Sequence, residues 1–235
     1  MLLSGQVAIV AGAAGLGRSV TRAFAREGAA VVVGDPREGT LVVEKAEVAA
    51  LGGVIRTVAT ELTHAADGER LVAAALDAFG RVDVVVTNAH VPESADRLAA
   101  ADLGAWRRDL DAGVFAALHL ARAAIPPMRA ERHGSIVFVN ASVLRGAAAR
   151  QGAHAAASGA LLTAAQVLAR ELGPANIRVN TIVPLPSDDG RPAAPGPLPH
   201  VDDDAGADAI VFLASDLASV VTGQSLDVQT GPVRR

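Results

Sequence analysis

The amino-acid sequence alternates short runs of apolar, mostly β-branched residues with longer stretches of helical periodicity. The runs predict strands at residues 7–10, 30–33, 54–58, 82–87, 135–140, 178–183 and 225–228. The stretches between them predict helices at residues 16–27, 40–51, 65–79, 103–129, 152–172 and 204–214. Glycine follows four of these helices, at Gly28, Gly52, Gly80 and Gly173. Because the strands are apolar throughout, helices must cover both faces of their sheet, which predicts an α/β fold with a doubly wound, parallel, seven-stranded sheet.

Proline marks two places where this pattern should be interrupted. The pair Pro126-Pro127 lacks two amide donors, so it should end or kink the helix at 103–129 near Ile125. Residues 184–200 hold six of the twelve prolines and have no periodicity, which predicts a rigid loop. This loop leaves the carboxyl end of the sixth strand and should border a ligand pocket, unless it is only a surface connection. No repeat or linker divides the chain, so we expect one domain over residues 1–235.

Composition excludes several classes of function. The chain has 235 residues, a net charge of −4 and no basic run, so a nucleic-acid partner has no electrostatic footprint. It has no cysteine, which excludes a disulfide framework, a thiolate metal site and a cysteine nucleophile, and no other spacing predicts a metal site. No run of 18 apolar residues and no charged leader followed by an apolar stretch occur. We therefore expect a cytoplasmic protein that binds a small molecule and no membrane.

A glycine-rich turn, Gly12-Ala13-Ala14-Gly15-Leu16-Gly17, lies between the first predicted strand and the first predicted helix. Glycines allow the backbone to approach a pyrophosphate, and the free amides at the helix start attract its charge. Asp35 ends the second strand, where a carboxylate can accept hydrogen bonds from the adenosine ribose and would repel a 2′-phosphate. The turn predicts a dinucleotide site, with NAD preferred over NADP. The alternative is that Asp35 is a solvated turn residue before Pro36.

From end to end the sequence resembles the short-chain dehydrogenase/reductase family. The matching blocks, in order, are residues 3–8, the glycine turn, 79–83, 87–89, 177–180, 212–216 and 221–224. The resemblance implies a Rossmann-fold NAD(P) protein that acts on alcohols or carbonyls. It also implies a homodimer or homotetramer joined through its long helices.

The family's catalytic tyrosine and lysine are both replaced. The chain has no tyrosine, and its single lysine is Lys45. In the stretch that resembles the family's Tyr-x-x-x-Lys helix, His154 occupies the tyrosine position and Ser158 the lysine position. The i, i+4 spacing keeps both on one helix face, but a serine has no charge with which to tune its neighbour.

Other catalytic positions differ as well. A gapless alignment puts Ala141 at the family's serine, whereas one deletion puts Ser142 there, and we favour Ser142. No asparagine lies between Asn88 and Asn140, so the asparagine expected near Leu110 is absent. The structural block that normally ends Asn-Ala-Gly reads Asn88-Ala89-His90, which should bring a second imidazole, His90, to the same cleft.

The resemblance also predicts how a cofactor would be held. The implied contacts are Gly12, Gly15, Leu16, Gly17, Asp35, Glu61, Asn88 and Ala89. Glu61 occupies the usual aspartate position near the adenine. The turn has two residues between its first two glycines where the family has three, which changes the pyrophosphate cradle. The adenosine half of the site therefore resembles the family better than the nicotinamide half.

These observations leave three hypotheses. The first is proton chemistry without net redox, such as dehydration, isomerisation or cyclisation of a small carbonyl compound. In it His154 is the acid or base, His90 its counterpart and Ser142 a hydrogen-bond donor. The second is an NAD-dependent oxidoreductase in which His154 protonates the carbonyl as hydride arrives. The third is a non-catalytic protein that keeps the fold to bind a partner, such as an active relative.

Overall fold

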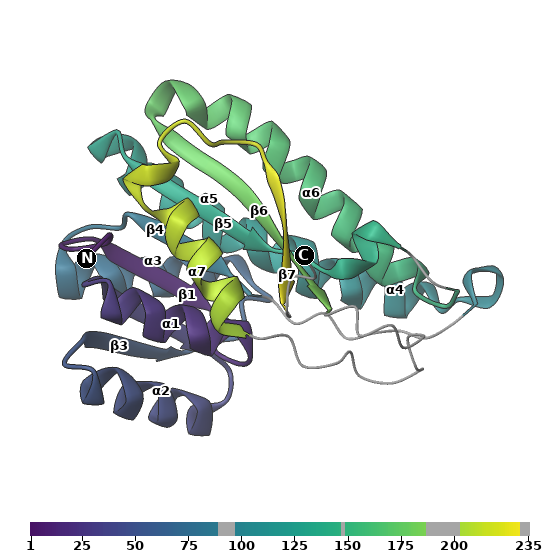
Figure 1. Cartoon of the computed structure of the whole chain (residues 1–235). Coiled ribbons are helices and arrows are strands. Elements are labelled where there is room, and N and C mark those ends of the chain that lie inside the picture. Colours follow the sequence, from purple (N-terminus) through teal and green to yellow (C-terminus); the bar gives the residue numbers. More distant parts are fainter. Residues whose placement is uncertain (89–96, 147–148, 187–202, 231–235) are drawn as a thin grey trace, which may run out of the picture.

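The computed structural model describes residues 1–88, 97–146, 149–186 and 203–230, which form one parallel sheet with helices on both faces (Figure 1). The strand order is β3-β2-β1-β4-β5-β6-β7, and every neighbouring pair is parallel. The strands are β1 (Val7–Ala11), β2 (Ala30–Asp35), β3 (Val54–Ala59), β4 (Val84–Thr87), β5 (Gly134–Val139), β6 (Ile177–Pro186) and β7 (Ser225–Thr230). The predicted doubly wound, seven-stranded sheet is confirmed.

Two apolar layers form the core, one on each face of the sheet. On one face α1 (Leu16–Arg26), α2 (Glu38–Ala50) and α7 (Asp203–Ala214) pack, and α1 and α7 lie side by side (Figure 1). On the other face lie α3 (Ala65–Phe79), α5 (Ala116–Glu131) and α6 (Gly152–Leu172), with α4 (Leu103–Leu110) against α6. Strand residues alternate between the two layers, so both faces are apolar, as the sequence pattern requires. Within the described residues no helix combines the length and the apolar character needed to cross a membrane.

The predicted helix at 103–129 differs from the structure in two ways. It is interrupted at Asp111–Phe115, one turn of π-helix between α4 and α5. Pro126 and Pro127 lie inside α5, so the helix does not end near Ile125, and the alternative of a kink there stays a prediction. Proline in a helix interior costs about 3 kcal/mol. Ala124 and Met128, fully buried on either side of the pair, hold the helix against the sheet.

The sixth strand is longer than predicted, since β6 includes Pro184 and Pro186, which the sequence pattern assigned to a loop. The pairing explains how a strand tolerates these prolines. β5 pairs with β6 only as far as Ile182, and the next residues of β6 pair with β7 alone. Proline lacks an amide donor and is accepted where a strand has a free side. Residues 187–200, the rest of the predicted loop, lie outside the described residues.

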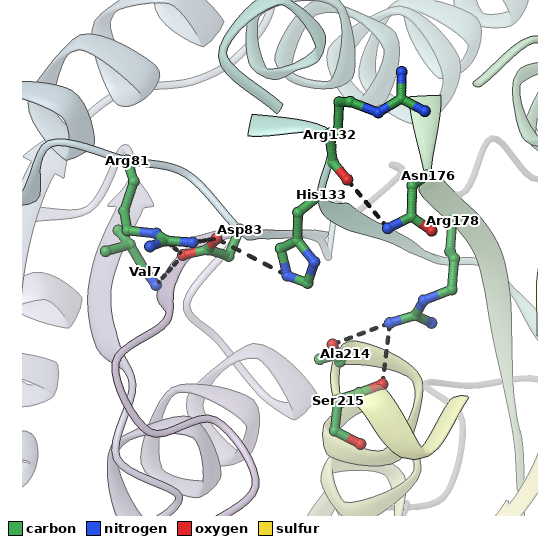
Figure 2. Close-up of polar contacts among 9 residues, drawn as sticks. All are labelled: Val7, Arg81, Asp83, Arg132, His133, Asn176, Arg178, Ala214 and Ser215. Atoms are coloured by element: carbon green, nitrogen blue, oxygen red, sulfur yellow. Dashed lines mark hydrogen bonds and ion pairs between the residues drawn. The ribbon is translucent and has the colours of Figure 1, made fainter. Parts of the chain in front are cut away.

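Two buried charged residues fix the amino ends of the strands (Figure 2). Asp83 accepts the backbone N–H of Val7 at 2.8 Å and pairs with the guanidinium of Arg81 at 2.7 Å. The Arg178 guanidinium donates to the carbonyls of Ala214 and Ser215, both at 3.1 Å, at the end of α7. These contacts stabilise the amino edge of the sheet. In open α/β sheets ligands bind at the opposite edge, beyond the carboxyl ends of the strands.

Candidate active site

The turn between β1 and α1 is shaped by its three glycines and by Asn88. Gly12 has a φ of +89°, and a Cβ there would overlap the carbonyl oxygen of Asn88. A Cβ on Gly17 would overlap the carbonyl oxygen of Gly12, and Gly15 precedes α1 with a φ of +55°. The side-chain amide of Asn88 donates to the carbonyls of Gly12 at 3.1 Å and Ala14 at 2.9 Å. Asn88, predicted as a cofactor contact, therefore uses its amide to hold the turn.

Asp35 lies directly beside this turn, and its side chain is only 1% exposed. Its carboxylate accepts the N–H of Ala13 at 2.9 Å and three donors of Arg37, the backbone N–H, Nε and Nη2, at 2.8–2.9 Å. Burial by itself would raise the pKa of this carboxyl, but the hydrogen bonds from Arg37 and Ala13 outweigh burial and lower it. Asp35 is thus a buried, ionised group, and the alternative of a solvated turn residue is wrong.

A cavity of about 1010 Å³ opens at the carboxyl edge of the sheet, beside β1 and β4, where the strand order reverses. At one end it touches the glycine turn, Asp35 and the loop after β3; at the other it touches α6 and the end of β5. The predicted site residues that line it are Gly12, Gly15, Leu16, Asp35, Glu61, Asn88, Ser142, His154 and Ser158. One continuous space therefore joins the two halves of the predicted site.

The residues at the first end fit an adenine dinucleotide. The glycine turn leaves backbone, rather than side chains, to face a pyrophosphate, and the first turn of α1 has no acidic residue to repel it. The hydroxyl oxygen of Thr60 is buried in the cavity wall and has no hydrogen-bond partner among the described residues. Such a group favours a polar ligand that supplies the missing bond.

At the second end, α6 and β5 are joined by Asn140. His154, half-buried, and Ser158, 4% exposed, line the cavity from α6. The side chain of Asn140 donates to the carbonyl of Ser158 at 2.9 Å and accepts the N–H of Ala141 at 2.8 Å. Ala141 and Ser142 both line the cavity, so both alignments remain open, and Ser142 is the one that brings a hydroxyl.

Some predicted positions lie elsewhere. Gly17 is absent from the cavity lining and acts through the close packing of the turn. Ala89 and His90 lie outside the described residues. The position near Leu110 does not line the cavity; the wall on that side is formed by Ala112 and Gly113 of the π-helical turn and by Ala116. Within the described lining, this wall offers no side-chain polar group.

Sequence reasoning missed the role of Arg37, which lines the cavity beside Asp35. The sequence shows only that Arg37 lies two residues after Asp35, within reach of its carboxylate, and does not specify the side-chain conformation that makes the contact. It also missed Asn140, whose role depends on α6 being packed against the end of β5. In the part of the chain that the structure describes, no three acidic or histidine side chains gather as metal ligands.

Comparison with known proteins agrees with this geometry. A model of the family described as short chain dehydrogenase matches residues 6–188. L-rhamnose 1-dehydrogenase (NAD(P)(+)) of Azotobacter vinelandii is 34% identical, with 98% of each chain covered. 3-Oxoacyl-[acyl-carrier-protein] reductase of Thermotoga maritima is 30% identical, over 99% of this chain and 100% of the relative. The crystal structure of carveol dehydrogenase from Mycobacterium avium in complex with NAD superposes with a TM-score of 0.89 at 26% identity, covering 98% of each chain. The match over most of the chain, on a sheet of the same fold, shows that this protein belongs to the short-chain dehydrogenase/reductase family of oxidoreductases.

Proposed function

We propose that this protein is a nicotinamide-dinucleotide-dependent oxidoreductase that interconverts a small alcohol and its carbonyl, with His154 as the proton donor and acceptor. The observation that carries the proposal is the continuous cavity, which touches the glycine turn, Asp35 and His154. A dinucleotide and its substrate need one shared space, because hydride passes directly between them. The relatives named for L-rhamnose, a 3-oxoacyl group and carveol support an alcohol or ketone as substrate.

Each residue has a role that its chemistry allows. The glycine turn and the amides at the start of α1 hold the pyrophosphate, and the loop after β3 lies at the adenine end. A bound nicotinamide supplies or accepts the hydride. An imidazole exchanges protons near neutral pH, so His154 can give a proton to a carbonyl oxygen or take one from an alcohol. The hydroxyl of Ser142 can donate a hydrogen bond to the same oxygen.

A second candidate is proton chemistry without net redox, such as dehydration or isomerisation of a small carbonyl compound. Ser158 favours it, because a buried hydroxyl provides no positive charge where the family has a lysine. The wall of Ala112, Gly113 and Ala116 favours it as well, since it offers no polar side chain to a nicotinamide or substrate. The imidazole of His154 would serve this chemistry equally well.

Titration with NADH and NADPH, followed by reduction of a panel of ketones with NADH deuterated at C4, tests the proposal. Saturable binding and deuterium in the alcohol product are expected. Binding without deuterium transfer, together with solvent deuterium exchange into a carbonyl compound, would favour the second candidate. If neither nucleotide binds and no compound is converted, both catalytic proposals fail, and the third hypothesis, a non-catalytic protein that binds a partner, is favoured.

Arg37 should set the preference between the two nucleotides. The Arg37 side chain is 60% exposed and its guanidinium pairs with Asp35. It is therefore the positive group beside this carboxylate that a 2′-phosphate would contact. Arg37→Ala should leave NADH affinity within about threefold and weaken NADPH by about 10- to 100-fold, the size of a lost charged hydrogen bond. Fluorescence titration of both nucleotides measures this, with Arg22→Ala on α1 as control. An unchanged ratio of the two dissociation constants would show that Arg37 does not face the 2′ position.

A further inference from the structure

The loop after β3 holds one residue in an unfavourable backbone conformation. Leu62 has a φ of +61°, in the left-handed region that bulky side chains rarely adopt. Its side chain is buried in the core, while Glu61, Leu62 and Thr63 together line the adenine end of the cavity. A residue stays in such a conformation only where its surroundings hold it, and these positions gather at ligand sites.

The contact that holds Leu62 comes from α5, far away in the sequence. Nδ1 of His119 lies 3.3 Å from the carbonyl oxygen of Leu62. A carbonyl only accepts hydrogen bonds, so Nδ1 carries the hydrogen and donates it. The bond fixes the direction of the peptide between Leu62 and Thr63, and with it the backbone that faces the cavity.

The position of His119 is itself fixed by close packing of two helices. Gly68, in the first turn of α3, lies against the backbone of α5. A Cβ on Gly68 would lie 2.7 Å from the carbonyl oxygen of His119 and 3.0 Å from the backbone nitrogen of Leu120. No side chain fits between the helices there. Because α3 begins directly after the loop, this contact keeps the loop and the imidazole in register.

The other end of the loop is tied down independently. The backbone N–H of Thr60 donates to the carbonyl of Asp35 at 3.2 Å, and Arg70 donates to the carbonyl of Ala59. Arg70 also pairs with Asp67 at 3.0 Å. The sheet and α3 therefore fix the start of the loop. Leu62, further along, accepts its hydrogen bond from a different element, through the side chain of His119 on α5.

We propose that His119 is a positioning residue for the nucleotide base. By holding Leu62 in its left-handed conformation, it presents the backbone of Glu61, Leu62 and Thr63 to the adenine ring and gives the site its selectivity for adenine. It does so from α5, without touching the ligand. This role rests on the proposed function, because it requires an adenine dinucleotide in the cavity.

Two substitutions separate the hydrogen bond from the volume of the ring. His119→Leu removes the donor, whereas His119→Asn places an amide N–H close to the position of Nδ1. The probes are NADH and its hypoxanthine analogue, which differs only at the base edge. His119→Leu is expected to weaken NADH by about 3- to 10-fold and the analogue by less than twofold, so the preference for adenine falls. His119→Asn should restore that preference to within about twofold of wild type.

A control and the contrary outcomes complete the test. His133→Leu, at the amino edge of the sheet, should leave both affinities unchanged. Equal weakening of both nucleotides in His119→Leu, or an unchanged preference for adenine, would overturn the role of His119 alone. If the wild-type protein binds neither nucleotide, the proposed function fails and the positioning role fails with it. Thermal unfolding of each variant shows whether a reduced preference for adenine accompanies reduced stability. If His119→Leu is less stable, His119→Asn, which keeps the N–H donor, tests the role of the hydrogen bond.

Discussion

Replacing Glu44 by glutamine is expected to stabilise the protein against unfolding by about 2 to 3 kcal/mol at pH 8, with little effect near pH 4.5. Glu44 lies on α2 and is 0% exposed, and neither carboxylate oxygen has a hydrogen-bond partner within the described residues. Burial, followed by the charge of Glu47, raises its pKa to about 7, although Arg18, Arg22 and Thr21 on α1 oppose the rise. An ionised glutamate there is costly, and a neutral amide of the same shape costs less because it carries no charge.

The direction of the pH dependence follows from where the proton binds more tightly. The folded protein holds the Glu44 proton up to about pH 7, whereas an unfolded chain releases it around 4.5. The contribution of the protonated side chain is therefore fully present below pH 4.5 and is lost as the pH rises to about 7. Above that the loss is constant. Glu44→Gln has no such proton, so its stability should fall less over this range.

Urea unfolding of wild type and Glu44→Gln at several values between pH 5 and 8.5 measures the difference. Glu38→Gln provides a matched control, because Glu38 is an exposed carboxylate on the same helix. The control should follow the wild-type curve. If the free energies of unfolding of wild type and Glu44→Gln change with pH in parallel, the pKa of Glu44 is not raised in the folded protein. The carboxylate would then be stabilised by a polar partner or by water.

Glu44 also illustrates how much of the fold could be predicted from sequence. Leu41, Glu44 and Val48 have the spacing of one helix face, and this is the face that α2 buries, while Val42 and Val43 are exposed. The periodicity predicted the helix at residues 40–51, but the burial of Glu44 was not predicted. It did not predict that the other wall of that position would be α1, with Arg18 and Arg22, because this depends on how two helices pack.

The same division applies to the rest of the fold. Strand positions were predictable because a sheet covered on both faces requires runs that are apolar throughout, and Gly80 ends α3 in the left-handed conformation that favours glycine. The interruptions expected at proline did not all occur, because tertiary structure accommodates these residues. Pro126 remains in a helix whose flanking residues are buried, and Pro184 remains in a strand that has lost its neighbour on one side.

The parts of the candidate site that lie within one segment of the sequence were predictable. The contacts between segments that are distant in the sequence were not. The glycine turn and Asp35 follow from local sequence, and the pair His154 and Ser158 follows from the resemblance to the family. The structure brings all of them to one cavity. The occupation of Asp35 by Arg37 is a side-chain conformation, which no pattern specifies. The link from His119 to the loop after β3 joins residues 57 positions apart, and only the packing of α3 on α5 creates it.

Replacing His154 by alanine should lower the rate of the chemical step by about 10²- to 10⁴-fold while leaving NADH affinity within about threefold. His154 lines the end of the cavity formed by α6 and β5, which the proposed function assigns to the substrate, and an imidazole is the type of side chain that suits proton exchange near neutral pH. Single-turnover oxidation of NADH at a saturating concentration of a reactive ketone measures the step. His133→Ala, at the opposite edge of the sheet, is the matched control and should keep the wild-type rate.

His154→Asn distinguishes proton transfer from hydrogen bonding. Asparagine can donate a hydrogen bond to a carbonyl oxygen, but it does not give up a proton near neutral pH. If His154 transfers the proton, the asparagine variant should be as slow as the alanine variant. A rate within about tenfold of wild type would mean that His154 only orients the substrate and that the proton comes from water or another group. Because both the redox and the redox-neutral reaction need a proton at the same oxygen, this result bears on both, and deuterium transfer from NADH then separates them.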